Sequence, residues 1–552
     1  MSISGYSGVE FDFSPGAQVP LTGSDGETAA TQALSSAAYR DGPMTALIDK
    51  LTGVSVKAGR LSLFEPDLGE AFSHALEKRM IGGGHKQMVQ SFGMDPQTVV
   101  EHCLAASRIR KQRDARLTTV MVVCGLLFLP GVLLWLAAFQ LRKTVTRKKS
   151  QWDGLLGGAV LAVVAGLAAL LAWHPPFSGV VALYLRVLLL LPVAGWFIAK
   201  QICEKTALDL RNRWSSSLSG PNLGAKIPQA VPRNPTDKRA DALRQSLVEL
   251  AREQASNVVF YAGPKGILGM GPRWGVWQMA EQLVPADGKD FNRFRPWDVA
   301  RHIHDKLRDL DRSQLHAPGF PRPAVRHWVV RAVGENAGAV TRPTGDIVEG
   351  FTVKDYEIQR ICNEHGLGSG DRHYVGVQFT LWDGQLIITM MTSVSILANT
   401  LRVEVSGYAL GPINGAFLAK PSAPTKSVQK SVKFWETRTV KLPLMSTTEV
   451  VRLAARAPLT WFPKPLEHLG GSLSLPEPFG LRHAWADKPW QHRFMTDDVT
   501  RTATPVLHAV HAATLAVLRD NGVDTTMFSS RAMSLSGAVQ SAEPGTPDNY
   551  SA

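Results

Sequence analysis

Cysteine is scarce in this chain of 552 residues. Its four cysteines lie far apart and none belongs to a CxxC pair: Cys103, Cys124, Cys203 and Cys362. This excludes a disulfide-rich scaffold and the usual structural zinc site. Charged residues make up 19% of the chain and hydrophobic residues 45%, which excludes a wholly disordered protein.

Recognisable catalytic motifs are also missing. No GKS or GKT is present, the histidines do not form HExxH, and Ser369 within GLGSG is not centred as a nucleophile elbow requires. No RRM, helix-turn-helix or zinc-finger pattern accompanies the net charge of +13. We therefore predict no catalytic residue, no metal ligand, no cofactor and no nucleic-acid partner, although catalytic groups can converge from distant positions.

Long apolar runs are concentrated in one part of the chain, at residues 117–141, 155–173 and 180–199. About 20 apolar residues are enough to cross a bilayer as a helix. The first 40 residues lack the basic start and apolar stretch of a signal peptide, so we expect the N-terminal region to begin in the cytoplasm. The sequence predicts an α-helical membrane segment of two or three helices over residues 117–202.

Basic residues flank the first run on both sides. We predict that these ten form a collar facing anionic lipid head groups: Arg108, Arg110, Lys111, Arg113, Arg116, Arg142, Lys143, Arg147, Lys148 and Lys149. Residues 174–178 contain no Lys or Arg, so the positive-inside rule places them outside and the C-terminal region inside. The expected location is the cell (inner) membrane, multi-pass, with a cytoplasmic C-terminal domain.

Pro130-Gly131 interrupts the first run near its middle. A proline removes a helix hydrogen bond and glycine permits a sharp turn. The first run therefore either re-enters on the same side, which keeps both basic clusters inside, or spans fully with the N-terminus outside.

Small residues repeat every four positions in the second run, at Gly154, Gly158, Ala162 and Gly166. This stripe predicts close helix packing, either on the third run or on a second copy of the chain. Arg186 lies inside the third run near its outer end. It either snorkels to the interface or marks a transport pathway.

The remaining regions divide by composition. Residues 1–40 are predicted to be a disordered tail, 41–116 an acidic helical domain with the basic collar, and 203–239 a juxtamembrane helix and linker. Residues 240–535 are predicted to form a cytoplasmic domain and 536–552 a second disordered tail.

Periodicity gives the fold class of the large domain. Strands are predicted at residues 257–262, 325–333, 375–382, 385–393 and 401–408, with a hairpin turn at Asp383-Gly384. Helices are predicted at 44–52, 66–80, from Asp95-Pro96 onward, and at 240–255, 296–311, 448–455 and 504–520. The prediction is an α+β domain with an antiparallel sheet, beside a small N-terminal helical domain.

A glycine-rich loop follows the first predicted strand, with Gly263, Gly266, Gly269 and Gly271. A strand followed by glycines and Lys265 suggests a nucleotide or phosphate site. The next residues, 272–277, do not open a helix, so no helix N-terminus would face a phosphate. The loop is either purely structural or a ligand loop.

Two stretches, FGMDPQTVVEHCLAASRIRKQRDAR at 92–116 and NVVFYAGPKGILGMGPRWGVW at 257–277, carry a family resemblance. They resemble uncharacterised actinobacterial multi-pass membrane proteins with a strand and Gly-rich loop after the membrane segment. In those relatives the loop reads closer to YSG…PFVGSG, and residues 263–265 and Met270 depart from it here. The resemblance implies a membrane protein that serves cytoplasmic contractile injection systems.

These observations favour a non-enzymatic integral membrane anchor that presents cytoplasmic domains to a protein assembly. Its expected partners are anionic lipids, a cytoplasmic protein and a second copy of the chain. The alternative is a membrane-bound nucleotide-responsive sensor or enzyme that uses the Gly263–Gly271 loop. A small transporter that depends on Arg186 is a third hypothesis.

Overall fold

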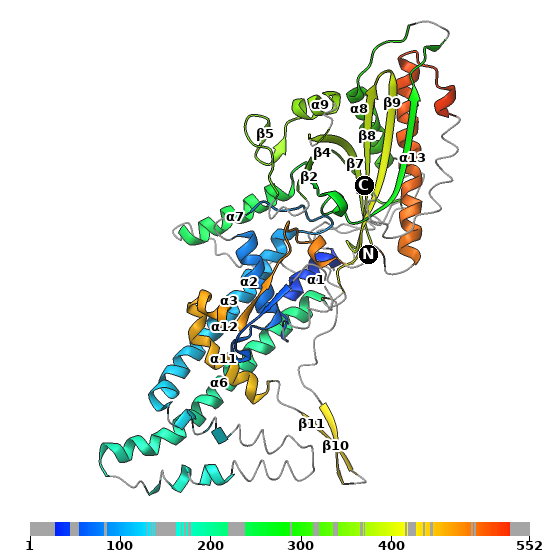
Figure 1. The fold of residues 1–552 in the computed structure, drawn as a ribbon. Helices are drawn as coiled ribbons and strands as arrows, with labels where there is room; N and C mark the ends of the chain where they lie inside the picture. The colour runs from blue at the N-terminus through cyan, green and yellow to red at the C-terminus, as the bar shows by residue number, and fades with distance from the viewer. Residues whose placement is uncertain are drawn as a thin grey trace, which may run out of the picture.

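The computed structural model describes residues 28–42, 44, 55–81, 86–129, 131–133, 135, 137–138, 162–166, 168–170, 173–174, 178–218, 238–286, 290–312, 320–334, 340–364, 368, 370–414, 417, 427–433, 436–441, 445–486, 490 and 493–529. A sheet-rich part occupies one end of the molecule, and a pair of long helices extends from the other end (Figure 1).

The centre of the sheet-rich part is a six-stranded sheet. Its first pair of strands is parallel and all others are antiparallel. The spatial order is β2 (Val258–Tyr261), β4 (Ala324–Ala332), β7 (Arg372–Leu381), β8 (Leu386–Leu397), β9 (Thr400–Leu410) and β3 (Arg273–Gln282). The predicted α+β domain is therefore confirmed, although its sheet, predicted to be antiparallel, contains the parallel pair β2–β4.

The predicted hairpin between β7 and β8 is also present. Trp382, Asp383 and Gly384 all have positive φ values, of 53°, 53° and 78°. Two-residue hairpin turns need such left-handed conformations, which Asp-Gly adopts at little cost.

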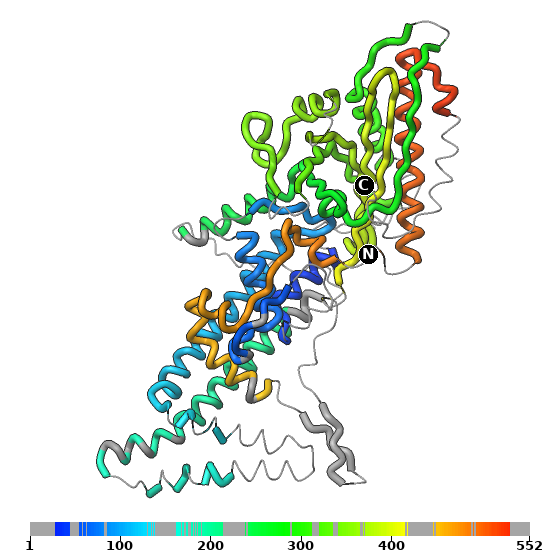
Figure 2. Tube along the Cα trace, in the orientation of Figure 1, coloured from blue at the N-terminus to red at the C-terminus, as the bar shows by residue number. Residues whose placement is uncertain are grey.

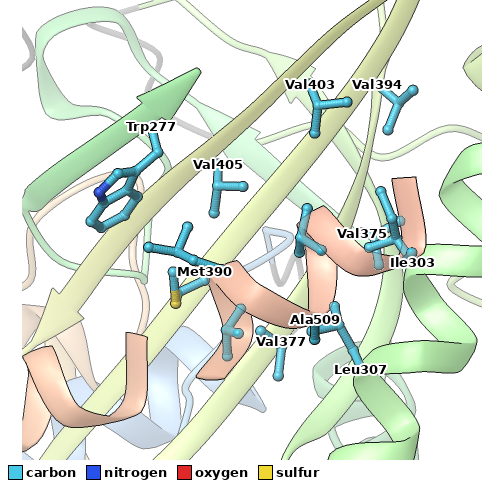
Figure 3. Packing of buried hydrophobic residues seen from close by; sticks show 14 of the residues in the cluster. Trp277, Ile303, Leu307, Val375, Val377, Met390, Val394, Val403, Val405 and Ala509 are labelled. Carbon is cyan, nitrogen blue, oxygen red and sulfur yellow. The ribbon is translucent and has the colours of Figure 1, made fainter. Parts of the chain in front are cut away.

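Two amphipathic helices, α8 (Pro296–Arg312) and α13 (Arg493–Asp520), pack together and against one face of the sheet (Figure 1). Ile303 and Leu307 of α8 meet Val375 and Val377 of β7 in this core (Figure 3). Each such side chain, when fully buried, stabilises the fold by about 1.5–3 kcal/mol. A shorter helix, α9 (Asp355–Glu364), packs beside α8 and β7.

The N-terminal region is helical, with α1 (Ala29–Ala37), α2 (Leu68–Met80) and α3 (Pro96–Cys124). Asp95 caps α3 by accepting hydrogen bonds from the backbone N–H groups of Gln97 and Thr98, as its position before a proline predicts. The structure differs from the predicted disordered tail over residues 1–40, because α1 is buried against α3. Its small residues, AATQALSSA, allow this close packing without a strongly apolar pattern.

The helical region is completed by residues from late in the chain. Strand β1 (Ser55–Ala58) pairs with β12 (Gly471–Ser474), and Phe72 of α2 lies 5.5 Å from the ring of Trp485. Figure 2 shows these early and late segments, in blue and orange, running side by side. Between them on the chain lie α11 (Thr447–Arg456), η9 (Ala457–Trp461) and α12 (Pro463–Gly470), which also contact the N-terminal elements. Residue 240 is therefore not a clean domain boundary.

The prediction of a membrane segment with two or three helices is wrong. Residues 117–124 are the last two turns of α3, and that helix ends at Cys124, next to Gly125. Within the described residues, one helical stretch, Arg186–Arg213, is long and apolar enough to cross a membrane. Gly125 caps α3, so this helix ends before the first apolar run is complete.

That stretch belongs to α6 (Val180–Leu218), which contains Pro192 and runs without interruption through the predicted juxtamembrane helix. The next helix is α7 (Lys238–Gln254). The shorter elements are η3 (Ser62–Phe64), η4 (Leu126–Phe128), η6 (Gly263–Lys265), β5 (Val348–Glu349), β6 (Thr352–Val353), β10 (Ser427–Lys433), β11 (Glu436–Lys441) and η10 (His483–Trp485). Most of the predicted 44–52 helix, the linker at 219–237 and the tail at 536–552 lie outside the described residues.

Candidate functional site: a pocket in the split sheet

The strongest candidate site is a pocket that opens where β7 and β8 separate. The antiparallel ladder between β7 and β8 runs from Leu381↔Leu386 to Val375↔Thr392 and stops there. Beyond that point, Arg372 and Tyr374 pair with β4, while Ser393 and Ser395 pair with β9. The two strands separate, and a pocket of about 660 Å³ opens at the split.

Basic, aromatic and hydroxyl side chains line this pocket together. They are Arg273, Arg372, Arg402, Tyr261, Tyr374, Tyr408, Ser393, Ser395 and Ser406, with Asp371 and Glu404 as the acidic members. Burial is the main reason that the pKa of Tyr374 is raised, so its hydroxyl is protonated and can donate a hydrogen bond at neutral pH.

Both acidic lining residues are already engaged by arginines. Asp371 accepts two hydrogen bonds of 2.9 Å from the guanidinium of Arg331, and Glu404 lies 2.6 Å from Arg402. Arg372 donates to the carbonyl of Gly368 at 3.4 Å and contacts no carboxylate within the described part of the chain. The pocket therefore favours an anion.

The glycine-rich loop forms one wall of the pocket through Ile267, which bridges to Tyr261. Its glycines have positive φ values of 54°, 64°, 86° and 83° at Gly263, Gly266, Gly269 and Gly271. A Cβ at Gly271 would lie 2.1 Å from the carbonyl oxygen of Ala409, so only glycine fits there.

Three backbone amides of the loop are already bonded, within the loop or to β2. Gly266 N–H donates to Gly263 O at 2.9 Å, Leu268 N–H donates to Phe260 O at 2.8 Å, and Met270 N–H donates to Ile267 O at 3.3 Å. These groups are unavailable to cradle a phosphate as a P-loop does. No helix follows the loop, as predicted, and the next element is the unpredicted strand β3.

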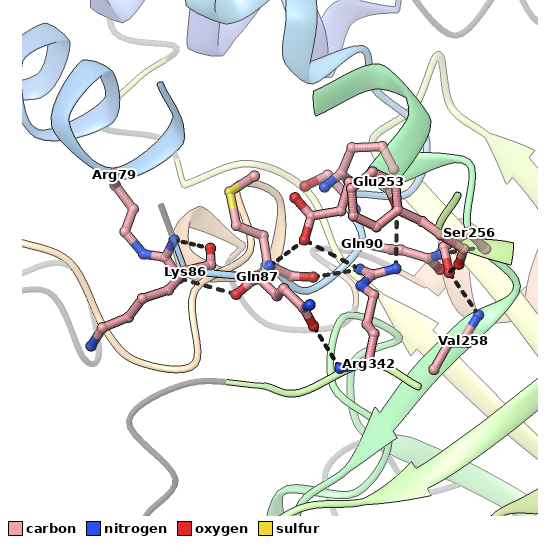
Figure 4. A network of polar contacts seen from close by, with 12 residues as sticks. Arg79, Lys86, Gln87, Gln90, Glu253, Ser256, Val258 and Arg342 are labelled. Atoms are coloured by element: carbon pink, nitrogen blue, oxygen red, sulfur yellow. Dashed lines mark hydrogen bonds and ion pairs between the residues drawn. The ribbon is translucent and has the colours of Figure 1, made fainter. Parts of the chain in front are cut away.

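Beside the loop, a polar network joins the segment between α2 and α3 to α7 and to Arg342. The connecting segment, residues 86–94 between α2 and α3, crosses here, and a Cβ at Gly269 would lie 2.8 Å from the carbonyl oxygen of Gln90. Met88 N–H donates to Glu253 Oε1 at 2.7 Å, and Met88 O accepts from Arg342 at 2.7 Å (Figure 4). The pocket wall is therefore rigidly tied to α2 and α3.

Three histidines come together beside α8, and one of them, His373, also lines the pocket. His304 of α8 stacks on His327 of β4 at 4.5 Å, and His327 Nδ1 lies 3.0 Å from His373 Nε2 of β7. Burial, followed by the charge of His304, lowers the pKa of His327 to about 4. Sequence spacing could not reveal this cluster, because each histidine comes from a different element. No group of three metal-ligating side chains with suitable geometry occurs within the described residues.

The predicted basic collar does not stay together. Arg110 and Arg113 are buried, with Arg110 donating to the carbonyls of Gly69 and Ala38 and Arg113 bonded to Asp114 at 2.8 Å. Arg108, Lys111 and Arg116 are exposed on the other side of α3. The second half of the collar, residues 142–149, lies outside the described residues.

The predicted small-residue stripe is described only at Ala162 and Gly166, and both are exposed. Close helix contact occurs at other glycines instead. A Cβ on Gly195 of α6 would lie 2.6 Å from the Cβ of Cys124 at the end of α3. Gly195, an isolated glycine inside the third apolar run, could have indicated this contact from the sequence. Arg186 is exposed on α6.

The cysteines do not form a nucleophilic site. All four are free, and burial raises the pKa of the Cys362 thiol, which lines the pocket, to about 12. At neutral pH this thiol stays protonated and is a poor nucleophile.

The structure is thus an α+β domain with a pocket in its sheet, joined to a helical region. In sequence, residues 276–546 match the family model of the AbeC-like domain. The match begins within β3 and includes the pocket residues of β7, β8 and β9, whereas Tyr261, Ile267 and Arg273 precede it. No curated protein and no solved structure matches the chain.

Proposed function

We propose that this chain is a membrane-anchored docking protein without catalytic activity, which presents its sheet domain to a protein assembly in the cytoplasm. One observation carries the proposal: more than half of the exposed large hydrophobic side chains in the described part of the chain lie between residues 121 and 198. They include Leu126, Leu127, Leu190 and Phe197, which are 63%, 61%, 57% and 55% exposed. Soluble monomers rarely expose so much contiguous apolar surface.

Helix α6 has two different halves, which suits an anchor. The apolar residues 180–199 would extend about 30 Å, the thickness of the hydrocarbon core. Only 18% of the candidate spanning window is buried, unlike the core helix of a soluble protein. Past residue 199, Leu210 is buried in the core of the helical region and Arg211 is bound to Asp41.

Residues at the junction of the two halves fit a membrane interface. The ammonium of Lys200 lies 5.6 Å from the ring centre of Trp196, and Lys205 is exposed one turn further on. Aromatic and basic residues are typical of the region where a helix leaves the bilayer on the cytoplasmic side. Exposed Arg108, Lys111 and Arg116 on α3 add positive charge suited to anionic lipids.

The resemblance of residues 92–116 and 257–277 to actinobacterial membrane proteins extends the proposal to the partner. We infer that the assembly is a cytoplasmic contractile injection system, which would dock at the membrane through this chain. The split sheet also favours a second candidate function, ligand sensing at the pocket between β7 and β8.

Fractionation of cells that produce the full chain tests the anchor. The wild type should sediment with membranes and resist extraction by high salt and alkaline carbonate. Leu190→Glu combined with Phe197→Glu places two charges on the exposed apolar half of α6, each costing about 2.5–3.5 kcal/mol at the centre of a membrane helix. This variant should shift to the soluble fraction.

Leu208→Glu is the matched control, because Leu208 is 42% exposed on the polar half of the same helix. It should remain in the membrane fraction. A wild-type protein that carbonate extracts, or an equal response of Leu208→Glu and the double variant, would contradict membrane anchoring through α6.

A further inference from the structure

The pocket in the split sheet has the features of a ligand site that the anchor function does not require. Its volume of about 660 Å³ falls within the range of small-molecule sites, roughly 300–1,000 Å³. It forms where the β7–β8 ladder ends, so its walls are two strands that remain firmly paired on their outer sides. Such walls hold side chains in fixed positions.

One side of the split supplies a cation and the other supplies hydroxyl groups. Arg372 extends from β7, where it pairs in register with Val330 of β4. Ser393 and Ser395 lie across the split on β8, in register with Glu404 and Arg402 of β9. A guanidinium opposite two hydroxyl groups is a suitable arrangement for a phosphate or carboxylate.

The acidic side chains of the pocket do not compete for Arg372. Asp371 accepts hydrogen bonds from Nε and Nη2 of Arg331, and Glu404 forms an ion pair with Arg402. The lining therefore presents more positive than negative charge, and the acids present are neutralised by other arginines.

Aromatic rings from three strands provide the second half of the site. Tyr261, Tyr374 and Tyr408 come from β2, β7 and β9, and all line the pocket. Tyrosine combines a flat apolar ring with a hydroxyl that can act as donor or acceptor. A ligand with both a ring and an anionic group would use both features.

We propose that this pocket binds an anionic ligand that carries an aromatic ring, the chemistry of a nucleotide, with its anionic group at Arg372, Ser393 and Ser395 and its ring against Tyr374 and Tyr408. The anion would thus bind to side chains of the split strands, and not to the glycine-rich loop, where the amides of Gly266, Leu268 and Met270 are already bonded to backbone carbonyls. This inference is independent of membrane anchoring and would stand if the anchor failed.

Binding of ATP and GTP to the purified full chain, measured by calorimetry and by the shift in melting temperature, tests the proposal. At least one nucleotide should bind, and Arg372→Gln should weaken it about tenfold to a hundredfold, as expected for loss of a charged hydrogen bond. Ser395→Ala should weaken binding less. Arg301→Gln, an exposed arginine on α8, is the matched control and should bind like the wild type.

Two further probes separate the parts of the ligand. Pyrophosphate and adenosine should each bind more weakly than ATP, because each lacks one half of the recognised chemistry. Absence of binding by both nucleotides would overturn the proposal, as would unchanged affinity in Arg372→Gln. Binding of a poly-glutamate peptide in their place would also overturn it and would identify the pocket as a site for acidic peptides.

Discussion

The buried ion pair between Glu253 and Arg342 should control whether the connecting segment stays attached to the sheet domain. Both side chains are almost inaccessible, with 0% and 2% exposure, and Oε1 of Glu253 lies 3.7 Å from Nη2 of Arg342. Both also bind Met88, the carboxylate through its N–H and the guanidinium through its C=O, each at 2.7 Å. The Arg342 guanidinium additionally lies 5.4 Å from the ring centre of Phe260.

Removing one partner leaves the other charge buried without compensation. Arg342→Met should therefore destabilise attachment of the segment by about 3–5 kcal/mol. Glu253→Gln keeps an acceptor for Met88 but leaves the guanidinium with carbonyl partners alone, so we expect a similar or slightly smaller loss. The double variant should cost about 1–3 kcal/mol less than the sum of the single ones, because it leaves no unpaired charge.

Hydrogen exchange of peptides covering residues 86–94 is the appropriate assay, since it reports local opening. A loss of 3 kcal/mol corresponds to roughly a hundredfold faster exchange at Met88, Val89 and Ser91. Arg331→Met is the control, because Arg331 and Asp371 form a half-exposed pair with 29% and 22% exposure. Such pairs contribute about 0–1 kcal/mol. Exchange of the segment within threefold of wild type in Arg342→Met would refute the reasoning, and so would full additivity in the double variant.

Two other predictions follow from the helix contact and the histidine cluster. Gly195→Cys should form an intramolecular disulfide with Cys124 after mild oxidation, detected by mass spectrometry. The Cβ positions lie 2.6 Å apart, and a small outward shift of α6 would bring them to the spacing of about 3.8 Å that a disulfide needs. Gly166→Cys should not form this bond, since nothing lies within 4 Å of its Cβ position, and absence of the bond in Gly195→Cys would contradict the α3–α6 contact. The melting temperature should fall as the pH drops from 6.5 toward 4, because burial lowers the pKa of His327 to about 4 and the unfolded chain binds that proton first. His327→Gln should flatten this decline, whereas a change of equal size in His508→Gln, on the exposed side of α13, would argue against the role of His327.

Local chemistry accounts for the parts of the fold that the sequence predicted correctly. Asp95-Pro96 marks the start of α3, Asp383-Gly384 marks the hairpin, and alternation locates β9. These signals act over a few residues and depend little on distant partners. Strand β3 was missed because RWGVWQMAEQ lacks regular alternation, and it is stabilised by its ladder with β9.

Features that depend on distant partners were not predictable from spacing. Arg110 and Arg113 lie in a basic cluster and were therefore predicted to face lipid head groups. In the structure, the nearby carboxylates of Glu70 and Asp114 stabilise their charges in a buried position. The pocket forms where the hydrogen-bond ladder between β7 and β8 ends, and no pattern of residue types predicts that point. The glycine pattern at residues 263–271 predicted either a structural loop or a ligand loop. The hydrogen bonds of its backbone amides favour the structural loop.

The pairing of β1 with β12 has a consequence for biosynthesis. Phe72 needs Trp485 and Phe417 to fill its surroundings, so the earliest helices emerge from the ribosome more than 300 residues before their last partners exist. Until then their apolar faces must be shielded by other means. For the same reason, a fragment cut at residue 240 would expose Phe479 and Trp485 to water, and studies of the sheet domain require the whole polypeptide.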